Sequence, residues 1–231
     1  MDGAGLGGVQ VAEGIHKIDG VRGANAYLVL SPEGAVVVDT GLPGNEARIA
    51  EYLKKAGVDK PLWIVLTHPD IDHSGSAAKL KALTGAKVAI HAADAPRLAG
   101  EMKLKEVKGA AGLLLNVMSP FIRFTPVKAD VLLNGGETMS GLTVVHTPGH
   151  TAGSVCLYKD GVAMFVGDAL RTDSEGKPGL SSASMTADME KAKESAKKIA
   201  GYRYKLLLPG HGPPITKDAS KAMAKFVQSS L

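Results

Sequence analysis

Cysteine, aromatic residues and long apolar runs are the scarce features of this 231-residue sequence. Its single cysteine, Cys156, excludes an intrachain disulfide framework and any cysteine-rich zinc finger. Cys156 lies in an alternating segment, residues 154–158, which predicts a strand and a buried, unreactive thiol. Aromatic residues make up 4% of the chain, so the core must be built mainly from Val, Leu, Ile, Ala and Met.

No stretch approaches the roughly 20 apolar residues that a membrane-spanning helix needs. Residues 1–14 hold Gly and other small residues but no basic region followed by an apolar run, so we expect no secretory signal. We therefore expect a cytoplasmic protein with no membrane partner. Gly/Ser linkers and low-complexity segments are also missing, which predicts one domain over residues 1–231. The sequence does not decide between a monomer and a homodimer.

A net charge of +4 and a pI near 9.0 permit attraction to anionic substrates. A nucleic-acid-binding protein would concentrate its basic residues in a stripe. The Lys residues are instead spread along expected helix faces, as in residues 188–200. The expected partner is therefore a small-molecule substrate and not a nucleic acid.

Apolar runs and alternating segments predict strands, and a spacing of three to four residues predicts helices. The expected strands are residues 9–18, 26–30, 35–39, 63–66, 87–91, 131–133, 142–146, 154–158, 162–166 and 205–208. The expected helices are residues 45–56, 73–83, 188–200 and 218–227. Two rounds of strands followed by helices predict an α/β (α+β) fold with two sheets face to face and helices outside.

The segment at about 101–125 follows neither pattern. It is Lys-rich at first and then markedly apolar through Leu113, Leu114, Leu115 and Phe121. It is compatible with a helical lid over a pocket or with a core helix, and the sequence does not separate the two.

The most informative stretch comes directly after the short apolar run 63–66. Four side chains able to ligate a metal fall within six residues there: His68, Asp70, Asp72 and His73. The carboxyl end of a buried strand is where α/β folds place their active sites. A structural role explains one or two of the four, for example Asp72 as a helix N-cap, but not all of them.

Three more candidates follow strands in the same way. His150 comes after strand 142–146, Asp168 after strand 162–166 and His211 after strand 205–208, each beside a Gly that permits a sharp turn. Each alone would be an ordinary loop residue. Together with the first four they predict a metal site.

These motifs resemble those of the metallo-β-lactamase-fold hydrolase superfamily, in its glyoxalase II and lactonase-like branch. The resemblance covers nearly the whole chain, from Val36-Val37-Val38-Asp39-Thr40-Gly41 to His211, in the family's order. It implies a four-layer αβ/βα sandwich of two mixed β-sheets with helices on the outer faces. It also implies a binuclear metal centre.

The family pattern assigns one metal ion to His68, Asp70 and His150. It assigns a second ion to Asp72, His73 and His211, with Asp168 bridging both. The chain departs from the usual His-x-His-x-Asp-His motif at one position, because Asp70 replaces the second His. The resemblance implies two divalent ions, zinc first, and the added carboxylate makes iron or manganese more plausible.

The resemblance implies a metal-activated, bridging hydroxide that cleaves a carboxylic ester, lactone or thioester, including substrates with an acyl chain. Asp72 is the expected catalytic residue, shuttling a proton in addition to ligating metal. Asp39 is expected to orient a ligand or turn. Alternatives are a phosphodiesterase or nuclease on the same site, a diiron redox protein related to the flavodiiron proteins, or a metal-free binding module.

Overall fold

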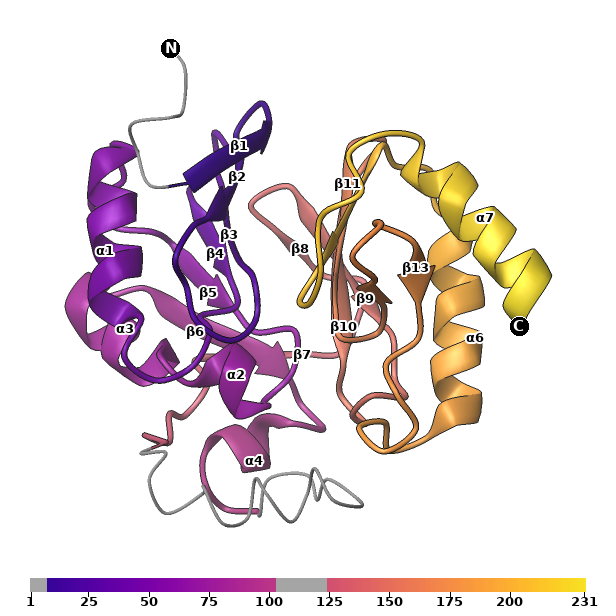
Figure 1. The fold of residues 1–231 in the computed structure, drawn as a ribbon. Coiled ribbons are helices and arrows are strands. Elements are labelled where there is room, and N and C mark those ends of the chain that lie inside the picture. The colour runs from indigo at the N-terminus through magenta and orange to yellow at the C-terminus, as the bar shows by residue number, and fades with distance from the viewer. Residues whose placement is uncertain (1–7, 103–123) are drawn as a thin grey trace. The chain divides into compact units, whose positions relative to one another are not determined.

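The computed structural model describes residues 8–102 and 124–231, which form two compact units (Figure 1). Residues 8–102 and 124–132 belong to the first unit, and residues 133–231 to the second. The predicted insert at about 101–125 lies almost entirely outside the described residues. Whether it is a lid or a core helix therefore stays a prediction.

The first unit is built on a mixed sheet of seven strands in the order β1-β2-β3-β4-β5-β6-β7. Strands β3 and β4 are antiparallel to each other, whereas β4, β5 and β6 run parallel. The strands are β1 (Gly8–Ala12), β2 (Ile15–Ile18), β3 (Ala26–Val29), β4 (Val36–Val38), β5 (Trp63–Val65), β6 (Lys87–His91) and β7 (Val131–Leu133). The helices are α1 (Glu46–Lys55), α2 (Ile71–Ser74), α3 (Ala77–Thr84) and α4 (Ala95–Leu98).

Helices α1 and α3 pack on one face of this sheet (Figure 1). Amphipathic spacing gives α1 the apolar stripe Ile49, Tyr52 and Leu53, which is buried against strand residues such as Leu28 and Ile64. Glu46 in the first turn and two Lys residues in the last turn also suit the dipole of α1.

The second unit holds a mixed sheet of five strands in the order β14-β11-β10-β9-β8, in which β11 and β14 are parallel. Helices α6 and α7 pack on one face of it around Cys156, Met164 and Leu207 (Figure 1). The elements are β8 (Thr138–Met139), β9 (Leu142–His146), β10 (Val155–Lys159), β11 (Ala163–Gly167), β14 (Leu206–Pro209), α6 (Met189–Ala200), α7 (Ala219–Ser230) and the small pair β12 (Arg171–Thr172) and β13 (Pro178–Gly179).

The prediction of two mixed β-sheets with helices is confirmed. Two predicted elements are wrong in detail. Residues 9–18 are not one strand, because Gly14 adopts a left-handed φ of 67° and turns the chain back as the hairpin β1–β2. Residues 73–83 are not one helix either, since α2 ends at Ser74 and α3 begins at Ala77.

Gly75, which lies between α2 and α3, packs tightly against its surroundings. A Cβ atom on Gly75 would collide with the Ile71 carbonyl oxygen and with Pro43. The backbone of α2 therefore packs closely on the turn that follows β4, and this fixes the position of the ligand-bearing segment. Among the helices in the part of the chain that the structure describes, none is long and apolar enough to cross a membrane.

Candidate metal centre

In the first unit, the candidate residues gather where the parallel strands β4 and β5 end. Asp39 follows β4, and Thr67 and His68 follow β5. The ends of adjacent parallel strands meet at one edge of a sheet, and ligands of open α/β sheets bind outside that edge. The topology therefore brings Asp39 to the segment 67–75 although the two are far apart in sequence.

Asp39 is the centre of a buried hydrogen-bond network. Its Oδ1 accepts a hydrogen bond from the Thr67 backbone N–H at 2.8 Å, and its Oδ2 accepts from the Thr67 hydroxyl at 2.8 Å. The same Oδ2 lies 2.8 Å from Nδ1 of His73. Asp39 is 2% exposed and adopts a left-handed φ of 57°, a conformation that non-glycine residues rarely hold without strong local support.

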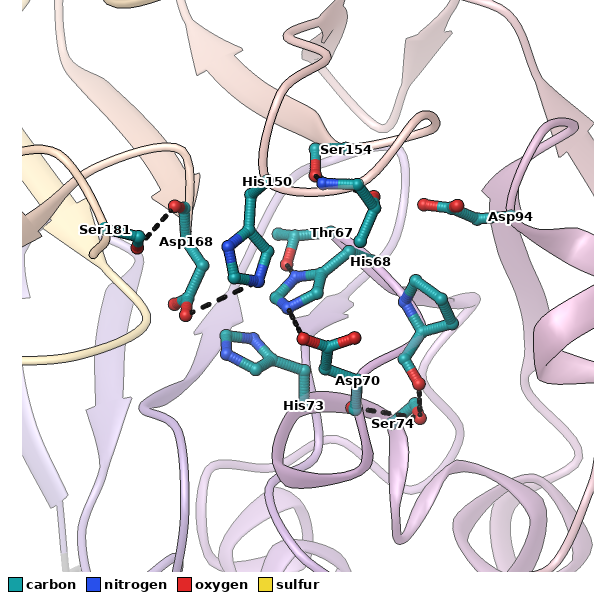
Figure 2. A network of polar contacts seen from close by, with 12 residues as sticks. Thr67, His68, Asp70, His73, Ser74, Asp94, His150, Ser154, Asp168 and Ser181 are labelled. Carbon is teal, nitrogen blue, oxygen red and sulfur yellow. Dashed lines mark hydrogen bonds and ion pairs between the residues drawn. The ribbon is translucent and has the colours of Figure 1, made fainter. Parts of the chain in front are cut away.

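This network fixes the tautomers of two histidines. A carboxylate only accepts hydrogen bonds, so Nδ1 of His73 must carry the proton that it shares with Asp39. The Thr67 hydroxyl proton is already donated to Asp39, so the 3.1 Å contact between Thr67 Oγ1 and His68 Nδ1 requires His68 to donate as well (Figure 2). In the neutral rings the lone pair then lies on Nε2, the arrangement of metal-ligating histidines.

Hydrogen bonds hold the backbone of the segment 67–75, here called the ligand turn, on both sides. The His73 carbonyl accepts hydrogen bonds from the Thr40 N–H at 2.7 Å and the Thr40 hydroxyl at 3.0 Å. The Asp72 carbonyl accepts from the Ala24 N–H at 3.0 Å. The Ser74 hydroxyl donates to the carbonyls of Pro69 and Asp70, so the segment is closed on itself (Figure 2).

All four predicted ligands of the first unit lie close together. Nε2 of His68 is 3.6 Å from Oδ2 of Asp70, and the His68 and His73 rings have centroids 4.0 Å apart. Asp72 and His73 offer ligand atoms within 4.8 Å of each other, as do His68 and His73. The four candidate ligands of the first unit therefore form one compact, half-buried group of donor atoms.

In the second unit, His150 is positioned by the start of α6. The carbonyls of Gly149 and His150 accept hydrogen bonds from the N–H groups of Asp188 and Ala187, at 3.0 and 3.2 Å. Gly149 has a φ of 142°, and a Cβ atom there would collide with the backbone of Ala192 in α6. Only glycine allows this close approach, which explains the Gly in front of His150.

Asp168 faces both histidines of the second unit. Its Oδ2 lies 3.8 Å from Nε2 of His150 (Figure 2). The same Oδ2 lies 3.6 Å from Nε2 of His211. The Ser181 hydroxyl donates to the Asp168 carbonyl at 2.8 Å, and the Thr172 N–H donates to the His211 carbonyl at 3.1 Å. One carboxylate oxygen between two imidazoles is the arrangement expected of a bridging ligand.

The donor set fits metal ions in both units. The three Nε2-to-Oδ2 separations of 3.6, 3.8 and 3.6 Å are longer than hydrogen bonds. Two atoms bonded to one ion at about 2.0–2.2 Å are separated by roughly 3–3.6 Å, close to these values. The donors are imidazole nitrogens and carboxylate oxygens, which suit zinc, iron and manganese. The grouping of all seven residues around two ions stays a prediction.

Sequence reasoning overlooked two supporting residues, Thr67 and Ser181. Thr67 could have been found, since it directly precedes His68 at the end of an apolar strand. Ser181 offers no such signal, because it reaches Asp168 only through the fold. The expectation for Asp39, to orient a ligand or turn, is confirmed by its bonds to His73 and Thr67.

The remaining polar residues have structural environments. His146 hydrogen-bonds the Ala152 carbonyl at 3.0 Å, within the loop that leads to His150. His16 contacts the Tyr52 hydroxyl at 2.9 Å. Cys156 is buried as expected, and burial raises the pKa of its thiol to about 12 despite an opposing hydrogen bond with Thr147. The thiol is therefore protonated at neutral pH and is no nucleophile.

Comparison with known proteins gives relatives that are named as hydrolases. The chain is 28% identical to the probable metallo-hydrolase YflN of Bacillus subtilis, over 90% of this chain and 88% of that protein. It is 32% identical to the human acyl-coenzyme A thioesterase MBLAC2, over 64% of this chain and 58% of MBLAC2. It is 29% identical to a hydroxyacylglutathione hydrolase of Hyphomonas neptunium, over 68% of this chain and 51% of that enzyme.

Solved structures show the same fold. A metallo-β-lactamase with a HARLDQ motif from Cronobacter sakazakii superposes with a TM-score of 0.71 at 20% identity, over 96% of this chain and 90% of that one. The protein TTHA1623, solved in a di-iron-bound form, superposes with a TM-score of 0.67 at 29% identity, over 87% and 92% of the two chains. These likenesses confirm the predicted α/β sandwich fold.

The sequence profile of the metallo-β-lactamase superfamily matches residues 19–211, a range that includes every predicted ligand. The predicted resemblance is thereby confirmed. The chain belongs to the metallo-β-lactamase superfamily.

Proposed function

We propose that this protein is a metal-dependent hydrolase that binds two divalent ions and cleaves a small carboxylic ester, lactone or thioester. One ion would be held by His68, Asp70 and His150. The other would be held by Asp72, His73 and His211, with Asp168 shared between the two.

The observation that carries this proposal is the orientation of the histidines in the first unit. Asp39 and Thr67 hold the Nδ1 atoms of His73 and His68, which leaves the lone pair of each neutral ring on Nε2, the usual metal-ligating nitrogen. A histidine with no functional role does not require a hydrogen bond from Nδ1 to a buried aspartate that holds a left-handed backbone conformation. The cost of holding Asp39 in that conformation is of the order of 1–3 kcal/mol, which favours a functional reason for it.

Two bound divalent ions would lower the pKa of a water molecule and polarise the substrate's carbonyl oxygen. The protein's own residues have three tasks. Asp39 and Thr67 orient the imidazoles through their Nδ1 atoms, as ligation through Nε2 requires. Asp168 brings one carboxylate oxygen to both His150 and His211. Asp72 would accept the proton of the attacking water at its carboxylate and return it to the leaving group.

Asp70 makes the proposed donor set richer in carboxylates than the family motif. Asp70, Asp72 and Asp168 bring three negative charges, against a combined +4 for two divalent ions. Carboxylates favour harder ions than imidazoles do, so iron or manganese can compete with zinc here. The di-iron form of the relative TTHA1623 supports the same inference.

The names of the relatives favour carbonyl chemistry. MBLAC2 is named an acyl-coenzyme A thioesterase, and a second relative is named a hydroxyacylglutathione hydrolase. We therefore rank thioesters, esters and lactones ahead of phosphodiesters, which only the positive net charge of the chain favours.

The test is turnover of a substrate panel by the wild type and by two ligand variants. The panel holds a p-nitrophenyl ester, an acyl-lactone, a thioester and a phosphodiester. His73→Ala and Asp168→Ala should each abolish both bound metal and carbonyl hydrolysis with little change in soluble yield. Asp59→Ala, at an exposed position in the bend that follows α1, is the control and should behave as wild type.

Full ester turnover in either ligand variant would contradict the binuclear site. Turnover of the phosphodiester alone would keep the site and reject the substrate class. Two bound irons without any hydrolysis would instead favour the diiron redox alternative.

A further inference from the structure

A second polar pair lies at the end of the next parallel strand. β6 ends at His91, and the chain turns through Asp94 into α4, which carries Arg97. Asp94 is completely buried, and its Oδ1 lies 3.2 Å from Nη1 of Arg97. A buried carboxylate therefore anchors one end of the Arg97 guanidinium.

The turn that positions this pair is rigid. Nδ1 of His91 accepts a hydrogen bond from the Ala93 N–H at 3.1 Å, and the His91 carbonyl accepts from the Asp94 N–H at 3.0 Å. The Asp94 carbonyl accepts from the Arg97 N–H at 3.1 Å. Each bond fixes the backbone between the strand end and the guanidinium.

The remaining donors of Arg97 are only partly used. A guanidinium has five N–H groups in a planar fork, and Asp94 takes one of its nitrogens. The Arg97 side chain is 24% exposed, yet its Nε is buried and meets no acceptor among the residues that the structure describes. A buried, unpaired donor is unfavourable by about 1–3 kcal/mol, so it calls for an explanation.

The pair lies at the same sheet edge as the ligand turn. Val65 of β5 pairs with Ala89 of β6, so continuing this register by two residues sets Thr67 beside His91. In Figure 2 the Asp94 carboxylate points toward the region where His68 and Asp70 lie. Asp94 thus brings Arg97 to the sheet edge that carries the segment 67–75.

We propose that Arg97 is a substrate-positioning residue that binds an anionic group, a carboxylate or a phosphate, on the molecule hydrolysed at this site. The inference rests on the proposed function and narrows its substrate class to anions. Nε and the Nη atoms of one guanidinium present parallel N–H groups, which match two oxygens of a carboxylate or phosphate. Asp94 supplies the counter-charge that keeps this fork in place before substrate binds.

The experiment compares a charged and a neutral ester with the same leaving group. The charged one is the mono-4-nitrophenyl ester of pentanedioic acid, and the neutral one is 4-nitrophenyl pentanoate. Arg97→Gln should raise KM for the charged ester, relative to the neutral one, at least tenfold, with a much smaller change in kcat. Arg97→Lys, which keeps the charge but loses the fork, should fall between. Arg48→Gln removes the same charge from the exposed side of α1 and should leave both values unchanged.

A binding measurement separates failure of this inference from failure of the proposed function. Pentanedioate and inorganic phosphate are titrated by NMR into the full chain, which requires no turnover. Binding of either anion at least tenfold more weakly to Arg97→Gln than to wild type supports the inference, and the stronger binder identifies the anion. Equal binding in both proteins, or an equal rise of KM for both esters, overturns it and assigns Arg97 to anchoring Asp94 alone.

Discussion

At the scale of single residues, one carboxylate prepares two of the predicted ligands. Oδ2 of Asp39 accepts hydrogen bonds from both His73 and the Thr67 hydroxyl, and Thr67 in turn holds His68. Removing the Asp39 carboxylate should therefore disturb both imidazoles, that of His73 directly and that of His68 through Thr67.

Asp39→Asn tests this dependence while keeping the shape of the side chain. The amide turns an acceptor into a donor that faces the Thr67 hydroxyl and His73 Nδ1–H, so at least one imidazole must reorient. We expect metal affinity to fall by about 10- to 100-fold, the usual effect of losing such a supporting contact. Competition with a chelator measures it. Asp59→Asn is the matched control, and unchanged affinity in Asp39→Asn would contradict the role of the network.

Asp70→His tests whether the carboxylate sets metal preference. The substitution recreates the usual family motif and removes one negative charge from the proposed donor set. We expect the fraction of zinc to rise relative to iron and manganese when the metal-free protein is loaded from an equimolar mixture. An unchanged metal ratio, measured by elemental analysis, would show that residue 70 does not determine which metal the site prefers.

At the scale of elements, close contacts between turns and helices position the ligands. Gly149 touches the backbone of α6 directly in front of His150. Gly149→Ala would add a Cβ atom to a left-handed position with no room for it, so we expect a loss of roughly 2–4 kcal/mol in unfolding free energy. Urea denaturation measures this loss. Gly179→Ala, where a Cβ meets no atom within 4 Å, should change stability little; similar losses in both variants would reject the steric argument.

The entry of the chain into β7 is fixed by an ion pair. Lys81 Nζ lies 2.7 Å from both carboxylate oxygens of Asp130, and the Val88 N–H donates to Oδ2 at 2.8 Å. The hydrogen bond from Lys81, followed by that from Val88, holds the pKa of Asp130 below its ordinary value of 3.8, against the opposing effect of burial. Since the folded pKa is depressed, this stabilisation is complete above pH 3.8 and is lost as the pH falls through the folded pKa.

Asp130→Asn should therefore destabilise the protein by about 1 kcal/mol at pH 7, because the pair is partly screened by solvent. The difference from wild type should shrink as the pH falls below 3.8 and with added salt. Urea unfolding of the metal-free protein over a pH series measures it. Glu33→Gln, at an exposed turn, provides the control. A difference that is constant with pH would show that the Asp130 charge is not responsible.

Periodicity predicted most elements because strand ends and helix caps are local features. Strand Lys87–His91 and strand Leu142–His146 have the predicted bounds, and α1 (Glu46–Lys55) is one residue shorter at each end than the predicted helix 45–56. The split between α2 and α3 was missed, and Gly75 in this gap lies against Pro43, which is far away in sequence. The two-residue strands β8, β12 and β13 were missed because so few residues show no alternation.

At the scale of the whole molecule, family membership could be predicted from the sequence, whereas the contacts that support the candidate ligands could not. The ligand types recur after successive strands, which is visible in one sequence and agrees with the superfamily match over residues 19–211. The role of Ser181 depends on a tertiary contact with Asp168, and no local pattern reveals it. Each unit holds its own group of candidate ligands.

Metal stoichiometry tests most directly whether the seven candidate ligands together bind two metal ions, as we propose. Elemental analysis of the purified full chain, before and after loading with zinc, iron or manganese, should give about two ions per chain in the wild type and a marked loss in His73→Ala and Asp168→Ala. A chain that binds no metal even when it is supplied, or one whose metal content is unchanged in both variants, would contradict the claim.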